Sequence, residues 1–68
     1  MFPNLEAEMA RSGVSRSDVA RVLGKSYAST SRIFREETAT FSVADAIKLK
    51  ESFFDDCSIE YLFKEPGE

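Results

Sequence analysis

The sequence predicts an all-α protein with five helices in a single small domain. Apolar residues recur at intervals of three and four along most of the chain, and a serine precedes several of these stretches. No stretch of four or more residues alternates between apolar and polar side chains, as a half-buried strand would. At 68 residues the chain has room for one core. We therefore expect one domain over residues 1–68, ordered over about 3–64, with a short C-terminal tail at 65–68.

The first predicted helix begins at Pro3. Proline is favoured in the first turn of a helix because its missing N–H would have no partner there. Leu5 and Met9 are four residues apart and face inward, and Phe2 is placed to join them. Gly13 ends this helix.

Two short helices joined by a tight turn are predicted in the next stretch, SRSDVARVLGKSYASTSRIFR. Ser15 and Asp18 have the spacing of a capping box, so a helix begins at position 16. Gly24 ends it, because glycine adopts the left-handed conformation without strain. Ser26 then caps a second helix over residues 27–35. The inward side chains of the two helices are Val19, Ala20 and Leu23, followed by Thr30, Ile33 and Phe34.

Two more helices are predicted after residue 40. Ser42 and Asp45 have the spacing of a second capping box, and the helix that follows runs to about Phe53 or Phe54. Ser58 caps a final short helix with Ile59, Leu62 and Phe63. The fourth helix carries a wide apolar stripe, which consists of Val43, Ala46, Ile47, Leu49 and Phe53.

The composition disfavours several classes of protein. With Cys57 as its one cysteine and no histidine, the chain lacks the residues for an internal disulfide, a zinc site or Cys–His catalysis. No apolar run approaches the roughly 18 residues that cross a bilayer, and the first ten residues lack the basic segment of a signal peptide. We expect a cytoplasmic protein that is not an enzyme and has no metal, cofactor, small-molecule ligand or membrane partner.

Charge is distributed unevenly along the chain. The net charge is −3, but residues 16–35 carry five basic side chains and one acid. Residues 36–68 carry three lysines and nine acids. A positive stretch over the two central helices is compatible with nucleic-acid binding, whereas the overall acidity equally suits a protein-binding module.

The two central helices resemble the helix-turn-helix of the Cro and lambda-repressor-like (XRE-type) family. Ala20, Gly24, Ser26 and Thr30 occupy the positions of that pattern: the small residue, the glycine, the cap and the middle of the recognition helix. The likeness continues in order across five elements, from Asn4 to Phe63, and includes Phe41-Ser42-Val43 before the fourth helix and SIEYLF at the end. The resemblance implies a compact, five-helix lambda-repressor-like domain.

The resemblance also implies a function, that of a phage- or prophage-type transcriptional repressor. Such a protein binds a palindromic operator in double-stranded DNA as a homodimer and places its recognition helix, here residues 27–35, in the major groove. Arg32 is suited to guanine, because a guanidinium can bond O6 and N7 together. The residues implied to face bases are Tyr27, Ala28, Ser31 and Arg32. The residues implied to contact phosphates are Arg16, Lys25, Ser26 and Arg35.

The end of the chain is the implied dimer contact. Its apolar side chains exceed what a monomer of this length easily hides, and the expected interface consists of Phe54, Ile59, Tyr61 and Leu62. The alternative is that Ile59, Leu62 and Phe63 simply fill the core. Cys57 is expected to be an incidental, partly buried thiol.

The chain departs from the family pattern at two places. Glu36 and Glu37 stand where a glycine and a basic residue are usual, and acids there oppose the helix dipole and repel a phosphate backbone. Thr30 replaces a branched apolar residue, and we expect its hydroxyl to bond an earlier carbonyl. The two acids keep open an alternative function, in which the scaffold binds protein rather than DNA, as an antitoxin-like or anti-repressor factor.

Overall fold

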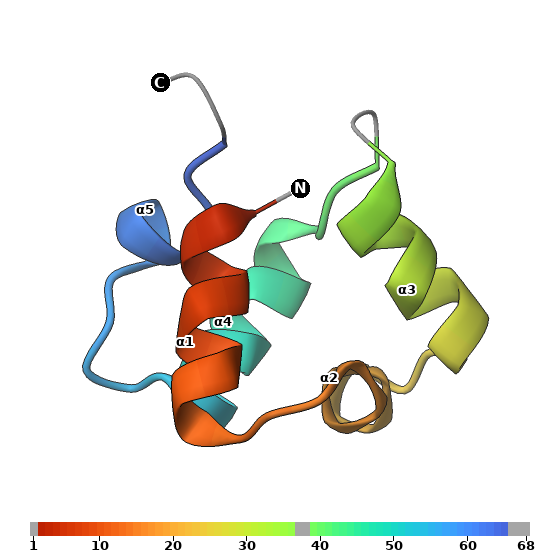
Figure 1. Cartoon of the computed structure of the whole chain (residues 1–68), viewed down its shortest axis with the longest axis horizontal. Coiled ribbons are helices and arrows are strands. Elements are labelled where there is room, and N and C mark those ends of the chain that lie inside the picture. Colours follow the sequence, from red (N-terminus) through yellow and green to blue (C-terminus); the bar gives the residue numbers. More distant parts are fainter. Residues whose placement is uncertain (1, 37–38, 66–68) are drawn as a thin grey trace.

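The computed structural model describes residues 2–36 and 39–65, and it contains five helices and no strand in that part of the chain. The prediction of an all-helical fold is therefore confirmed for the described residues, whereas Glu37 and residues 66–68 of the predicted tail lie outside them. None of these helices is long and apolar enough to cross a membrane. In chain order the helices are α1 (Pro3–Ser12), α2 (Arg16–Leu23), α3 (Tyr27–Arg35), α4 (Val43–Phe53) and α5 (Ile59–Leu62) (Figure 1).

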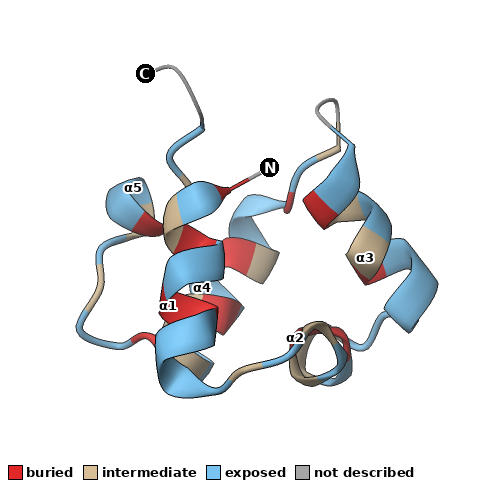
Figure 2. Ribbon diagram, in the orientation of Figure 1, coloured by how far each residue is buried: buried red, intermediate tan, exposed pale blue. Residues whose placement is uncertain are grey.

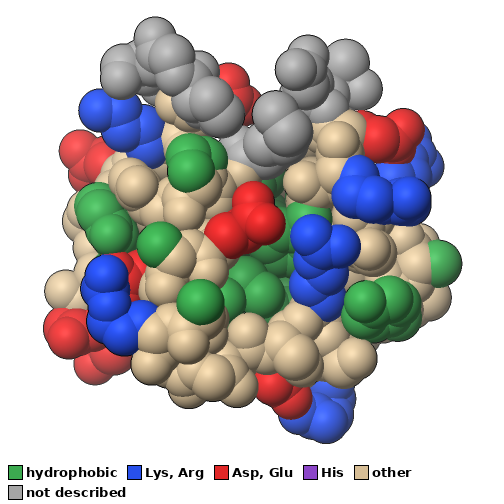
Figure 3. Space-filling view, in the orientation of Figure 1, with side chains coloured by type: hydrophobic (Ala, Val, Ile, Leu, Met, Phe, Trp, Pro, Cys, Tyr) green, Lys and Arg blue, Asp and Glu red, His purple; other side chains and the backbone are tan. Residues whose placement is uncertain are grey.

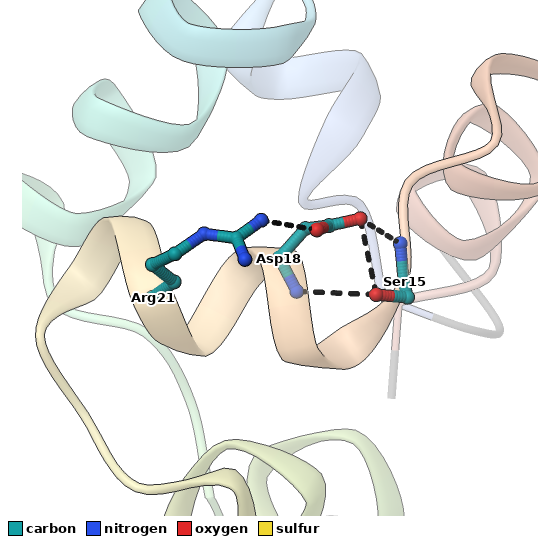
Figure 4. Close-up of polar contacts among 3 residues, drawn as sticks. All are labelled: Ser15, Asp18 and Arg21. Atoms are coloured by element: carbon teal, nitrogen blue, oxygen red, sulfur yellow. Dashed lines mark hydrogen bonds and ion pairs between the residues drawn. The ribbon is translucent and has the colours of Figure 1, made fainter.

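The helices begin and end where the local sequence predicts. The N–H of Asp18 donates to the hydroxyl of Ser15 at 3.1 Å, and the N–H of Ser15 donates to the Asp18 carboxylate at 2.9 Å, so the capping box at the start of α2 is complete (Figure 4). The Asp18 carboxylate accepts bonds from both the N–H and the hydroxyl of Ser15, and these two bonds, with the charge of Arg21, hold its pKa below the ordinary value. Gly24 ends α2 with a φ of 68°, in the left-handed region that favours glycine.

The second predicted capping box is only half formed. The hydroxyl of Ser42 accepts a hydrogen bond from the N–H of Asp45 at 3.1 Å. The Asp45 carboxylate lies instead 3.5 Å from the ammonium group of Lys25, in the turn before α3. A side chain expected to close α4 locally therefore links α4 to the turn between α2 and α3.

The core lies where the inner faces of all five helices meet (Figure 2). α2 packs against α3 and α4, and α5 packs against α1 and α4. Phenylalanine rings join the ends of these helices: the ring of Phe41 lies 5.6 Å from those of Phe2 and Phe34 and 5.7 Å from that of Phe63, measured between centroids. The other large apolar side chains of the core are Leu5, Met9, Val19, Leu49, Phe54 and Leu62.

The apolar stripe of α4 is narrower than predicted. Ala46 and Leu49 are buried, but the side chain of Val43 is 77% exposed and that of Ile47 is 40% exposed. The prediction of a wide apolar stripe packed on the core is therefore wrong at Val43 and Ile47, because only one narrow face of α4 contacts the other helices. Both side chains instead form an apolar surface near the start of α4.

Thr30 also departs from expectation. Its side chain is fully buried in the inner face of α3, yet its hydroxyl has no hydrogen-bond partner within the described part of the chain. The expected bond to an earlier carbonyl is not formed. A buried hydroxyl without a partner costs about 1–3 kcal/mol of stability, so Thr30 weakens the packing of α3.

Candidate nucleic-acid interface

α3 is held against α2 by a short connection. Gly24, Lys25 and Ser26 join the two helices, and the N–H of Lys25 donates to the carbonyl of Ala20 at 2.9 Å. Figure 1 shows α2 end-on and α3 beside it, running along one edge of the molecule. The buried side chains of Thr30 and Ala20 leave the opposite side of α3 open.

The open side of α3 is exposed and mostly polar. The side chains of Tyr27 and Arg32 are 55% and 68% exposed, and Ala28 and Arg35 are exposed as well. No residue of α3 is acidic. The blue outer side of α3 in Figure 2 corresponds to this surface, which we call the α3 outer face and define by Tyr27, Ala28, Arg32 and Arg35.

Ser31 does not belong to the α3 outer face, although the sequence placed it among the base-facing residues. It is half-buried, and its hydroxyl accepts a hydrogen bond from Nη1 of Arg16 at 3.0 Å. Ser29 is exposed instead, and its hydroxyl accepts a bond from that of Ser26 at 3.0 Å. Helical spacing alone could not decide between positions 29 and 31, because which of them faces α2 depends on how the helices cross.

Arg16 joins three helices. Its guanidinium carbon lies 5.1 Å above the centre of the Phe34 ring, and Nη2 lies 3.9 Å from a carboxylate oxygen of Glu6. A cation above an aromatic face is stabilising by roughly 0.5–1 kcal/mol where the site is exposed. Arg16 therefore has a structural role between α1, α2 and α3, and with its side chain 34% exposed it can offer only part of its guanidinium to a phosphate.

Most basic side chains in this region lie beside a carboxylate. Basic and acidic groups are neighbours on the α3 side of the molecule in Figure 3. Exposed ion pairs contribute only about 0–1 kcal/mol, so a phosphate or a base can replace the carboxylate at little cost. Because these carboxylates partly neutralise the basic side chains, the net positive charge counted in residues 16–35 overestimates the positive electrostatic potential at this surface. The pairs are Arg16 with Glu6, Arg21 with Asp18, Lys25 with Asp45 and Arg32 with Glu36.

The predicted dimer residues divide between core and surface. Phe54 and Leu62 are buried in the core, so neither side chain is accessible to a second copy, and those two predictions are corrected. Tyr61 is 40% exposed, but its hydroxyl donates to the Glu8 carboxylate at 2.8 Å and so ties α5 to α1. This hydrogen bond, with partial burial, raises the pKa of Tyr61. Ile59 is half-buried and remains at the surface.

An apolar groove of about 450 Å³ lies between the start of α4, the start of α1 and the end of α5. Val43 stands at this groove with most of its side chain exposed, a feature that the sequence did not reveal. Cys57 is half-buried, and burial raises the pKa of its thiol, which disfavours the reactive thiolate. The apolar side chains that line the groove are Phe2, Phe41, Val43, Ala46, Ile59 and Phe63.

Within the described residues, no three histidine, cysteine or acidic side chains are close enough together to hold a metal ion. Comparisons with protein-family models, with curated proteins and with solved structures found no match. The function is therefore inferred from the residues and from their arrangement in space.

Proposed function

We propose that this protein is a sequence-specific, double-stranded-DNA-binding transcriptional regulator of the phage-repressor type, with its five helices in a lambda-repressor-like arrangement. The observation that carries the proposal is the α3 outer face, an exposed surface at the edge of the molecule on a helix without acidic residues, although Glu36 just after the helix pairs with Arg32. The major groove is about 12 Å wide and admits one α-helix. α2 supports α3 from behind through the three-residue turn, as a recognition helix requires.

The side chains of the α3 outer face supply the contacts to base edges. Arg32 bonds guanine, Tyr27 donates to a base or a phosphate, and Ala28 contacts a thymine methyl group. Ser31 is left out of this set because its hydroxyl is already bonded to Arg16. The phosphate contacts come from Arg35 and Lys25, from the N-terminal turn of α3 at Ser26, and from the exposed part of Arg16.

We further propose that the protein acts in the cytoplasm as a homodimer on a palindromic operator. Two recognition helices related by a twofold axis read half-sites about 34 Å apart. Burial of Phe54 and Leu62 moves the proposed dimer surface to apolar side chains that remain accessible, which are Val43, Ile47, Ile59 and Tyr61.

The salt dependence of binding tests the proposal. Fluorescence anisotropy with a labelled random-sequence duplex pool should show an affinity that falls with salt, because each phosphate contact adds about 0.9 to the slope of log K against log salt. Arg35→Ala should lower that slope by about 1. Lys48→Ala removes a charge from the exposed side of α4 and should leave the slope unchanged. A folded protein that retains no duplex at low salt would contradict the proposal.

A protein-binding function is the second candidate. It is favoured by the apolar groove beside Val43 and by the carboxylates paired with the basic residues near α3. An antitoxin-like or anti-repressor factor would use the groove and would show no duplex binding in the same assay. The anisotropy assay therefore distinguishes the two candidate functions, because only the DNA-binding regulator retains the duplex.

A further inference from the structure

Glu36 and Arg32 are joined by two hydrogen bonds at the end of α3. The N–H of Glu36 donates to the carbonyl of Arg32 at 2.9 Å, and Nε of Arg32 donates to Oε2 of Glu36. Glu36 is the first residue after the helix and has an extended backbone, with φ −99° and ψ 130°. Its backbone bond to Arg32 fixes the position of its Cα, from which the side chain extends. The carboxylate is thereby placed directly beside the guanidinium.

This contact restricts how Arg32 can meet a base. A guanidinium carries five N–H donors in one plane, shared among Nε, Nη1 and Nη2. It can bond the O6 and N7 acceptors of guanine through its two Nη groups, or through Nε and one Nη group. While Glu36 occupies Nε, Arg32 meets a base through both Nη groups. An approach through Nε first requires the contact with Glu36 to break, which disfavours that approach by up to about fivefold.

The same carboxylate opposes binding that is not specific. An acid at the C-terminus of a helix interacts unfavourably with the helix dipole. A carboxylate close to the major groove of DNA also repels the phosphates of the DNA backbone. Specificity is a difference between affinities, and it increases when the wrong complexes are penalised.

We propose that Glu36 is a positioning residue that holds Arg32 in the orientation that selects guanine, and that it lowers affinity for other sequences. The proposal rests on the proposed function, because it assigns a role within the same DNA-binding face. The acid at the end of α3 is unfavourable for overall affinity for DNA, but it increases the preference for guanine over other bases.

Parallel selections from one random-sequence duplex pool test this role. Wild type, Glu36→Ala and Glu36→Gln are each used to retain duplexes at low salt, and the retained sequences are compared. A good bidentate contact discriminates by roughly 5- to 100-fold. We expect wild type to enrich guanine at one position of each half-site and Glu36→Ala to lose up to about fivefold of that preference, the most that an exposed ion pair can supply, while it retains more duplex overall.

Glu36→Gln separates orientation from charge, because it keeps a hydrogen-bond acceptor and loses the negative charge. We expect it to preserve part of the guanine preference, whereas an effect of charge alone would make it equal to Glu36→Ala. Glu51→Ala removes an exposed acid from α4 and should behave as wild type. An unchanged guanine preference in folded Glu36→Ala would overturn this inference alone. Retention of no duplex by wild type would overturn the proposed function, and this inference with it.

Discussion

The buried hydroxyl of Thr30 gives a stability prediction that depends on the packing of α3. The Thr30 side chain has no exposed surface, and its Oγ1 has no hydrogen-bond partner in the described part of the chain. Thr30→Val replaces that hydroxyl by a methyl group of similar size, and the two residues have similar helix propensities. We therefore expect Thr30→Val to increase the free energy of unfolding.

The expected gain follows from the unpaired hydroxyl. Leaving such a group buried costs about 1–3 kcal/mol, and a gain of about 1 kcal/mol corresponds to roughly 4–8 °C in Tm for a domain of this size. Urea unfolding followed by circular dichroism measures the change. The midpoint should rise while the m-value stays constant, because the surface exposed on unfolding is nearly the same.

Thr30→Ser is the matched control. It keeps the hydroxyl and removes the buried methyl group, so it should destabilise the protein by about 1 kcal/mol through lost burial and a small cavity. If Thr30→Val were folded but no more stable than wild type, the hydroxyl would have to be bonded in solution. The inner face of α3 around Thr30 would then pack differently from the structure.

Further predictions concern the α2 cap, two titrating groups and the proposed dimer surface. Ser15→Ala should lower the free energy of unfolding by about 1 kcal/mol in urea; no loss would mean that the capping box is not formed. Because the folded pKa of Asp18 lies below its ordinary value of 3.8, its contribution to stability is present above that value and is lost as pH falls through the folded pKa. Asp18→Asn should therefore flatten the acid limb of a plot of urea midpoint against pH, and an unchanged limb would argue against the shift. The pKa of Tyr61 is raised, so the contribution of its bond to Glu8 is present below the ordinary value of 10.0 and is lost as pH rises through the folded pKa. In an ultraviolet titration the component that ionises late should vanish in Tyr61→Phe; its persistence would assign it elsewhere. Val43→Lys should weaken self-association in sedimentation equilibrium without loss of helicity, because Val43 is exposed in the monomer, and equal association would exclude this surface.

The helices could be predicted because their signals are local. Ser15 and Asp18 form their cap within one turn, and Gly24 ends α2 whatever packs against it. The inward face of α4 could not be predicted in full, since Val43 and Ala46 are both apolar neighbours on the helix and only the helices that pack on α4, mainly α2 and α5, decide which of them is covered. Periodicity gives a face, but its width depends on tertiary contacts.

The candidate site was predicted only in part, for the same reason. The exposure of Tyr27 and Arg32 follows from the spacing of the buried residues in α3. The ion pair between Lys25 and Asp45 does not, because Lys25 lies in the turn between α2 and α3 and Asp45 lies in α4, and these segments meet only in the fold. The bond from Tyr61 to Glu8 spans 53 positions in the sequence, and no local pattern could have shown that this tyrosine joins α5 to α1.

The most direct test of DNA recognition by α3 is a map of amide chemical-shift changes. Nitrogen-15-labelled protein is titrated with the random-sequence duplex pool at low salt. The proposed function predicts changes concentrated in residues 26–36 and around the start of α2 at Arg16. Shifts confined to the groove beside Val43, or no shifts at all from a folded protein, would contradict the claim that α3 recognises DNA.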